Sequence, residues 1–192
     1  AKHSSLWLTG EGSRVRHSRF IHSQGDAISN QGLSSIVEFN EFADLNGSAI
    51  HLSSAVQTVV RNNHIWKTNQ QAERVQHAEA AITWSLFNTD IRVENNCSRD
   101  IPVAAFGDIF VHGGNRGASI QNNQICRTRS LLTVLSTEDL TAKLVLSNNV
   151  IERGGLMLLL GLNDNSNAVT RDASITDNSL IDQFDSGLIA GC

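Results

Sequence analysis

Proline and cysteine are both scarce in this chain of 192 residues. It contains one proline, so no proline-rich linker divides it into separate domains. Its three cysteines, Cys97, Cys126 and Cys192, are too few and too irregularly spaced for a disulfide framework or a CxxC zinc site. We therefore expect residues 1–192 to form a single continuous domain, long enough for a sizeable core and without a metal ion or other cofactor.

An excess of charge of one sign is also missing. The chain has 15 Lys and Arg residues against 19 Asp and Glu residues, a net charge of -4, and no basic run. This balance argues against nucleic acid and against a charged membrane surface as partners. The longest uninterrupted apolar stretch, residues 156–160, is far shorter than the roughly 18 residues that span a bilayer. The composition therefore predicts no membrane contact.

What the chain does contain is a six-residue pattern that occurs seven times. An aliphatic residue is followed by two variable residues, usually an asparagine, one variable residue and usually an apolar residue. The copies occupy residues 15–20, 37–42, 60–65, 93–98, 120–125, 146–151 and 175–180. The central residue is Ser18 in the first copy and asparagine in the others, at intervals of 22, 23, 33, 27, 26 and 29 residues. Because the interval varies while the hexamer does not, insertions must lie outside the hexamer.

A second apolar segment follows each hexamer, for example residues 25–28, 47–50 and 155–158. Each repeat therefore predicts a strand, a tight turn, a strand, a loop and a third strand. Such a unit is too thin to bury its own apolar face and becomes stable only when successive turns stack on one another. Stacked turns would place equivalent asparagines about 4.8 Å apart, where their amides can donate to and accept from each other. Residues 70–81 have helix-forming composition and predict about two helical turns in the longest insertion.

This pattern, with the asparagine pairs in residues 60–65 and 120–125, resembles the right-handed parallel β-helix of the pectate-lyase-like superfamily. The resemblance covers nearly the whole chain and implies an all-β, right-handed parallel β-helix of about seven coils with an internal Asn ladder. A leucine-rich repeat is the competing interpretation, but the chain lacks the LxxLxL spacing. The superfamily spans lyases, hydrolases, epimerases, tailspikes and adhesins, so the resemblance implies no single activity. A coil is already under way near Leu6, which predicts a fragment of a longer protein or ends covered by another subunit.

Candidate substrate-binding residues occur four positions after the centre of each hexamer. The opposite charges that alternate there are either solvated pairs, each contributing under about 1 kcal/mol, or the lining of a groove for sugar hydroxyls and carboxylates. His51 is expected to point outward from its strand, and Trp66 either stacks on a sugar ring or closes the edge of the core. The residues considered as substrate-binding are His51, Asp44, Lys67, Asp100, Arg127 and Trp66.

Candidate catalytic residues come from a second, weaker resemblance. The segments 88–90, 107–108 and 112–113 resemble the NTD, DD and HG elements of polygalacturonase-type hydrolases, which would make Asp90 and Asp108 the acid and base carboxylates and add His112. The chain departs from that pattern in three ways. The second element has one Asp, the histidine falls in the same strand as Asp108, and the basic RxK element is absent.

From these features we expect a carbohydrate-recognising domain of a secreted or surface polysaccharide-active protein, whose partner is a polysaccharide. Its location would be extracellular, periplasmic or on a virion surface. Two alternatives stay open: an active polysaccharide hydrolase or lyase, and a non-catalytic structural, adhesive or tailspike solenoid. Outward apolar residues Phe110, Met157 and Leu159 predict contact with a covering segment of the parent chain or with further protomers, as in a trimer. The histidines fall at different registers and predict no metal site.

Overall fold

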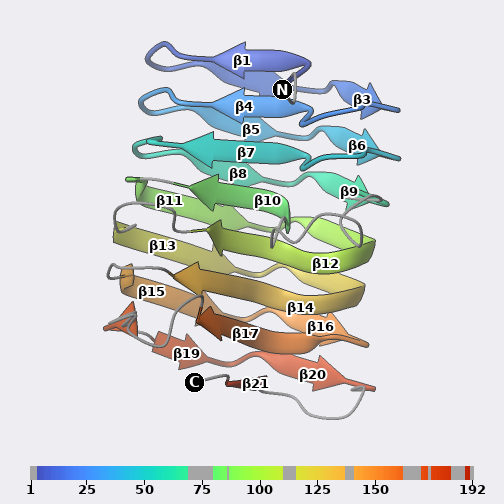
Figure 1. Cartoon of the computed structure of the whole chain (residues 1–192), viewed down its shortest axis with the longest axis vertical. Helices are drawn as coiled ribbons and strands as arrows, with labels where there is room; N and C mark the ends of the chain where they lie inside the picture. Colours follow the sequence, from blue (N-terminus) through green and yellow to red (C-terminus); the bar gives the residue numbers. More distant parts are fainter. Residues whose placement is uncertain are drawn as a thin grey trace.

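The chain folds into a parallel β-helix, as expected from the repeat. The computed structural model describes residues 4–68, 80–85, 87–109, 116–136, 141–161, 170–172, 174–182 and 189–190. All regular elements among them are β-strands, and their ladders are parallel from coil to coil. About seven coils stack along one axis from the N-terminal to the C-terminal end (Figure 1).

Each coil contributes a strand to each of three parallel sheets, separated by bends. We name two of the sheets by the bend at the central residue of the hexamer: the pre-bend strands precede this residue and the post-bend strands follow it. The pre-bend sheet consists of β2 (Arg14–Arg16), β5 (Ile36–Glu38), β8 (Val59–Arg61), β11 (Thr89–Glu94), β13 (Arg116–Gln121), β15 (Thr141–Ser147), β18 (Thr170–Arg171) and β19 (Ser174–Thr176). The post-bend sheet consists of β3 (Arg19–Ile21), β6 (Glu41–Ala43), β9 (His64–Trp66), the first parts of β12 (Cys97–Ile109) and β14 (Gln124–Ser136), β16 (Val150–Glu152) and β20 (Ser179–Ile181). The third sheet consists of β1 (Leu6–Leu8), β4 (Ile28–Asn30), β7 (Ile50–Ser53), β10 (Ala80–Ser85), the later parts of β12 and β14, β17 (Gly155–Gly161) and β21 (Ile189–Ala190).

Aliphatic columns fill the interior of the β-helix. The first position of the hexamer pairs directly with its equivalent in the next coil, as Val37 does with Val60, and these side chains are fully buried. The rings of Phe20 and Phe42 stack in the same way, with centroids 5.1 Å apart. Burial of each such side chain stabilises the fold by about 1.5 to 3 kcal/mol. Because every column crosses several coils, the apolar core is continuous along the axis.

The expected asparagine file is also present. Asn63 is fully buried, and its Oδ1 accepts from the backbone nitrogen of Asn40 at 3.0 Å. Its Nδ2 donates to the carbonyl of Val37 at 3.0 Å and to Oδ1 of Asn96 at 3.0 Å. Equivalent bonds continue through Asn123 and beyond. A buried amide with its partners satisfied is stable, whereas an orphaned one is costly, so this file holds neighbouring bends in register.

Backbones at the bends adopt left-handed conformations. The residue before each central position has φ near +55°, for example Asn62 at 54°. The residue four positions after each central position also has a positive φ, for example Lys67 at 49°. A third left-handed position begins the pre-bend strands, where glycine occurs at Gly12 and Gly117. Glycine and asparagine adopt this region most readily. These positions turn the chain from one sheet to the next.

The predicted helix and the predicted outward apolar residues lie largely outside the residues that the structure describes. Of the predicted helix over residues 70–81, Ala80 and Ala81 belong to β10, so the helix prediction is wrong there, and the remaining residues lie outside the described ones. Phe110 also lies outside them, while Met157 and Leu159 lie in β17, where only the backbone is described. Among the described residues, no helix is long and apolar enough to cross a membrane.

Candidate functional site

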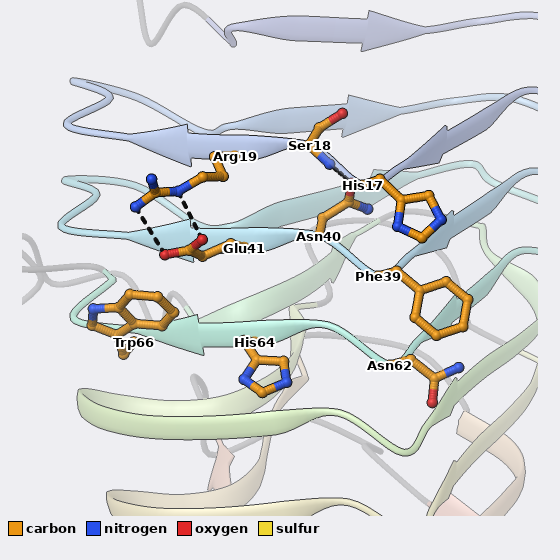
Figure 2. A pocket seen from close by; sticks show the side chains of 9 residues that line it. All are labelled: His17, Ser18, Arg19, Phe39, Asn40, Glu41, Asn62, His64 and Trp66. Carbon is orange, nitrogen blue, oxygen red and sulfur yellow. Dashed lines mark hydrogen bonds and ion pairs between the residues drawn. The ribbon is translucent and has the colours of Figure 1, made fainter.

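A groove of about 560 Å³ lies over the bends of the first three coils (Figure 2). It is formed by the left-handed residues before the bend, the central residues and the first residues of the post-bend strands. We call it the bend groove; its lining residues are His17, Ser18, Arg19, Phe39, Asn40, Glu41, Asn62, His64 and Trp66.

Two stacked aromatic rings form one end of the bend groove. The rings of His17 and Phe39 have centroids 5.4 Å apart and planes within 6° of parallel, and Phe39 is 48% exposed. Both residues have left-handed backbones, with φ of 53° and 55°. The equivalent residue in the next four coils is an asparagine, Asn62, Asn95, Asn122 and Asn148.

The left-handed backbone at Phe39 is unfavourable for its bulky ring, so the needs of the fold do not explain this residue. A non-glycine residue held in a sparsely populated region costs on the order of 1–3 kcal/mol, and asparagine tolerates the left-handed region better than a bulky ring. Phe39 is exposed, so burial does not repay that cost fully. Stacking on His17 offsets part of it, by about 0.5–1.5 kcal/mol. The pair therefore presents a flat apolar platform to solvent at a position where asparagine would serve the fold better.

The opposite end of the bend groove is formed by Trp66, on β9. Its ring is half-buried, and the guanidinium carbon of Arg99 lies 5.7 Å from the ring centroid. His64, on the same strand, is exposed between Trp66 and the aromatic pair (Figure 2). Trp66 is thus the last residue of β9 and lines the groove, and its stacking on a sugar ring stays a prediction.

Between these ends lies an ion pair on neighbouring coils. Arg19 and Glu41 pair in register on β3 and β6, with Nε to Oε2 at 2.7 Å and Nη2 to Oε1 at 3.1 Å. The parallel bonds hold both side chains flat along the groove, as Figure 2 shows. Such an exposed pair contributes under about 1 kcal/mol to stability. A ligand that displaces one partner of this pair therefore costs the fold little.

The charged column predicted from the sequence forms pairs between coils. Lys67 Nζ lies 3.8 Å from Oδ1 of Asp44, and Arg127 Nη2 donates to Oδ2 of Asp100 at 2.7 Å. The hydrogen bond from the Arg127 guanidinium lowers the pKa of the Asp100 carboxyl, and the same contact raises the pKa of Arg127. Because Asp100 already occupies the Arg127 fork, a ligand carboxylate would have to displace it. That these four residues bind substrate stays a prediction.

His51 lies on a different sheet from the bend groove, on β7 of the third sheet. Its Nδ1 lies 3.3 Å from Oδ2 of Asp26, and its Nε2 lies 2.8 Å from Oγ of Ser85. It therefore does not join Trp66 in a shared site. In the described part of the chain, no group of three or more His, Cys, Asp or Glu residues is arranged to hold a metal ion.

Two of the candidate catalytic residues, Asp90 and Asp108, fall on different sheets. Asp90 belongs to β11 of the pre-bend sheet and lines a second groove, of about 600 Å³, together with Arg92 and Lys143. Asp108 belongs to the later part of β12, where its backbone pairs with Trp84 of the third sheet; its side chain is outside the description, and His112 is outside the described residues altogether. The structure does not place Asp90 and Asp108 on one sheet, and their catalytic roles stay predictions.

The sequence contained a signal for the bend groove outside its charged column and its motifs. The residue before each central position is Asn or Asp in the last five coils and an aromatic ring in the first two, His17 and Phe39. An aromatic ring at a position that otherwise prefers Asn marks a departure from the needs of the fold. Arg19 and Glu41 occupy the same position of the first two hexamers, so the repeat also predicted that they become neighbours.

Comparisons with known proteins found no family model that matches this chain and no curated protein similar to it. Its function is therefore inferred from the geometry of the grooves.

Proposed function

We propose that this chain is a carbohydrate-recognising domain that binds a polysaccharide segment in the bend groove. The observation that carries the proposal is the stacked pair of His17 and Phe39, in which Phe39 is exposed and has a backbone conformation that disfavours its bulky ring. Sugar rings present an apolar face of C–H groups edged by hydroxyls. A flat aromatic platform beside planar charged groups is complementary to that surface.

The dimensions and polarity of the bend groove support a sugar ligand. Its volume of about 560 Å³ falls within the ordinary range of ligand sites. Because coils are about 4.8 Å apart, three coils span about 10 Å along the axis, which suits a short oligosaccharide segment. Arg19 supplies donors and Glu41 supplies acceptors for hydroxyls in the middle of the groove, and Trp66 offers a second ring face.

In this proposal the domain is a right-handed parallel β-helix of the pectate-lyase-like superfamily and belongs to a larger secreted or surface protein. A domain that binds a cell-surface or extracellular polysaccharide would itself be extracellular, periplasmic or on a virion surface. The parallel coils and the asparagine file support the assignment to this kind of fold.

The deciding experiment is the substitution Phe39→Asn. Asparagine is the residue found at this position in the next four coils, so the fold should tolerate it or gain stability. Loss of one stacking face removes about 1 to 2 kcal/mol of contact and should therefore weaken glycan binding by roughly 5- to 30-fold. Binding of neutral and acidic oligosaccharides is measured by calorimetry and by the change in intrinsic tryptophan fluorescence, to which Trp7, Trp66 and Trp84 all contribute.

Control variants separate a binding defect from a folding defect. The substitution Asn95→Ala changes the equivalent left-handed position one coil beyond the groove and should leave glycan binding unchanged. If no oligosaccharide in the panel binds the unsubstituted chain, or if Phe39→Asn binds as tightly as that chain, the proposal is wrong.

The second groove favours one further candidate, an active polysaccharide hydrolase or lyase. Asp90 is exposed there beside Arg92 and Lys143, so a carboxylate and two cations surround one surface. New reducing ends or unsaturated products that disappear with Asp90→Asn would support this activity. Polysaccharide binding with no product formed, even on prolonged incubation, would contradict it.

A further inference from the structure

Three successive coils bring together Asp26, which lies two residues before β4, and His51 and Ser85, which lie on β7 and β10 of the third sheet. The imidazole of His51 lies between the other two side chains, with Nδ1 3.3 Å from the Asp26 carboxylate and Nε2 2.8 Å from the Ser85 hydroxyl. The three residues are 25 and 34 positions apart in the sequence, so only coil stacking makes them neighbours. This is the hydrogen-bonding order of a nucleophile, a base and an orienting carboxylate.

The Asp26 carboxylate is held in place before it meets the imidazole. Its side chain is 11% exposed, and its Oδ1 accepts a hydrogen bond from the backbone nitrogen of Ser48 at 2.9 Å. The other oxygen, Oδ2, faces His51 Nδ1. A carboxylate at that nitrogen favours the tautomer that carries its proton on Nδ1 and leaves Nε2 free to accept one. The arrangement therefore sets His51 as a base directed at Ser85.

Ser85 is positioned by the backbone at the end of β10. Asn88 Nδ2 donates to the carbonyl of Ser85 at 2.7 Å, and Asn88 Oδ1 accepts from the backbone nitrogen of Ala55 at 2.9 Å. The corner that carries Ser85 is thus tied to the coil before it. A hydroxyl held on a fixed backbone beside a fixed base meets the geometric requirement for nucleophilic catalysis.

The site is open to solvent at the imidazole. In the same column of the third sheet, Ser29 and Thr83 flank His51 and are buried, whereas the His51 side chain is 32% exposed. Ser85 is half-buried. A reactant can therefore approach Nε2 and Oγ from outside, while the carboxylate behind them stays shielded.

We propose that Asp26, His51 and Ser85 form an acyl-transfer site that hydrolyses carboxylic esters. Ser85 Oγ attacks the ester carbonyl carbon while His51 Nε2 takes the hydroxyl proton. The bond between the acyl carbon and the alcohol oxygen breaks, the imidazolium returns the proton to the alcohol, and the acyl group stays on Oγ. Water, deprotonated by the same imidazole, then attacks the acyl carbon, which releases the carboxylic acid and restores the serine hydroxyl.

Esters are the substrate class that this arrangement fits best. An alkoxide is a better leaving group than an amide nitrogen and requires less assistance from an acid. The site shares no residue with the bend groove, so esterase activity and glycan binding are independent properties of the chain.

The test is covalent labelling of the whole chain by a fluorophosphonate probe, in which Ser85 Oγ displaces fluoride from phosphorus. Peptide mass spectrometry should locate the label on Ser85, and the chain should release p-nitrophenol from p-nitrophenyl acetate. Ser85→Ala should abolish the label, and His51→Gln should slow labelling by about a hundredfold or more. Asp26→Asn, which keeps an acceptor for Ser48, should slow it by at least about tenfold.

A matched control is available one coil earlier. Ser53 pairs with Ser85 in register, yet it is buried and is not the hydroxyl that contacts His51. Ser53→Ala should therefore leave labelling unchanged. Absence of label from the folded chain, or ester hydrolysis by Ser85→Ala at the unsubstituted rate, would overturn the proposal. Glycan binding by Ser85→Ala should equal that of the unsubstituted chain, so failure of one proposal is distinguishable from failure of the other.

Discussion

At the residue scale, the side chains of the asparagine file make many of the buried hydrogen bonds that join neighbouring coils. A central asparagine inside the file, such as Asn63, joins both neighbouring coils, because its Oδ1 accepts from the preceding coil while its Nδ2 donates to the preceding coil and to the next. Asn63 is fully buried, whereas Asn178, at the far end of the file, is half-buried. The same side chain should therefore contribute differently at the two positions.

Asn63→Ala should destabilise the protein by roughly 3 kcal/mol or more. The substitution leaves the backbone nitrogen of Asn40 and the carbonyl of Val37 buried without these partners, and each such group costs about 1–3 kcal/mol. Asn178→Ala is the control, and its loss should be smaller because water can reach that bend. Urea unfolding followed by circular dichroism measures both, and equal losses would contradict this account of burial.

At the element scale, the strands of successive coils are joined by columns of like residues, and opposite charges alternate in the outer columns. Asp100 and Arg127 occupy equivalent left-handed positions of neighbouring coils and pair through two parallel bonds. A carboxyl whose pKa is lowered by folding contributes stability that is present above its unfolded pKa and is lost as pH falls through its folded pKa.

The Asp100 pair should consequently stabilise the fold at neutral pH and lose that contribution under acid conditions. The lowered pKa of Asp100 comes first from the hydrogen bond with Arg127. In Asp100→Asn, the urea midpoint should fall slightly at pH 7, and the difference from the unsubstituted chain should shrink as the pH is taken from about 5 downward. A difference that grows on acidification would show that the sign is wrong.

At the scale of the whole molecule, stability depends on how closely one coil can approach the next. In stacked repeats each unit contacts only its neighbours, so a single obstructed interface weakens the whole column. A Cβ added at Gly47 would lie 2.6 Å from the backbone carbon of Gly25 in the preceding coil, while a Cβ at Gly10 would make only an ordinary contact of 3.7 Å with Ser13.

Gly47→Ala should therefore destabilise the protein by about 1–3 kcal/mol, the usual cost of overpacking. Gly10→Ala is the matched control and should be close to neutral. Thermal unfolding of the two variants side by side provides the measurement. Similar melting temperatures for both would mean that the coils can separate freely at this corner.

Two kinds of information about this protein can be separated. The repeat in the sequence determined the number of coils, the aliphatic columns and the asparagine file, as Val37 over Val60 and Asn40 over Asn63 illustrate. In a solenoid, equivalent positions in sequence become neighbours in space, so the hexamer alone predicts those contacts. Alignment of the hexamers also shows that Phe39 stands where later copies have asparagine, but only its left-handed backbone in the structure shows that this position disfavours a bulky ring.

Only the tertiary structure decided which residues outside the hexamer meet. Asp26, His51 and Ser85 come from segments whose spacing varies with the insertions, and their contacts depend on the register of the third sheet. The same register separates Asp90 from Asp108, although these residues are close in the sequence. The physical reason is that the asparagine file sets the stacking only at the bend. Elsewhere in the coil, loop length and strand pairing decide which side chains become neighbours.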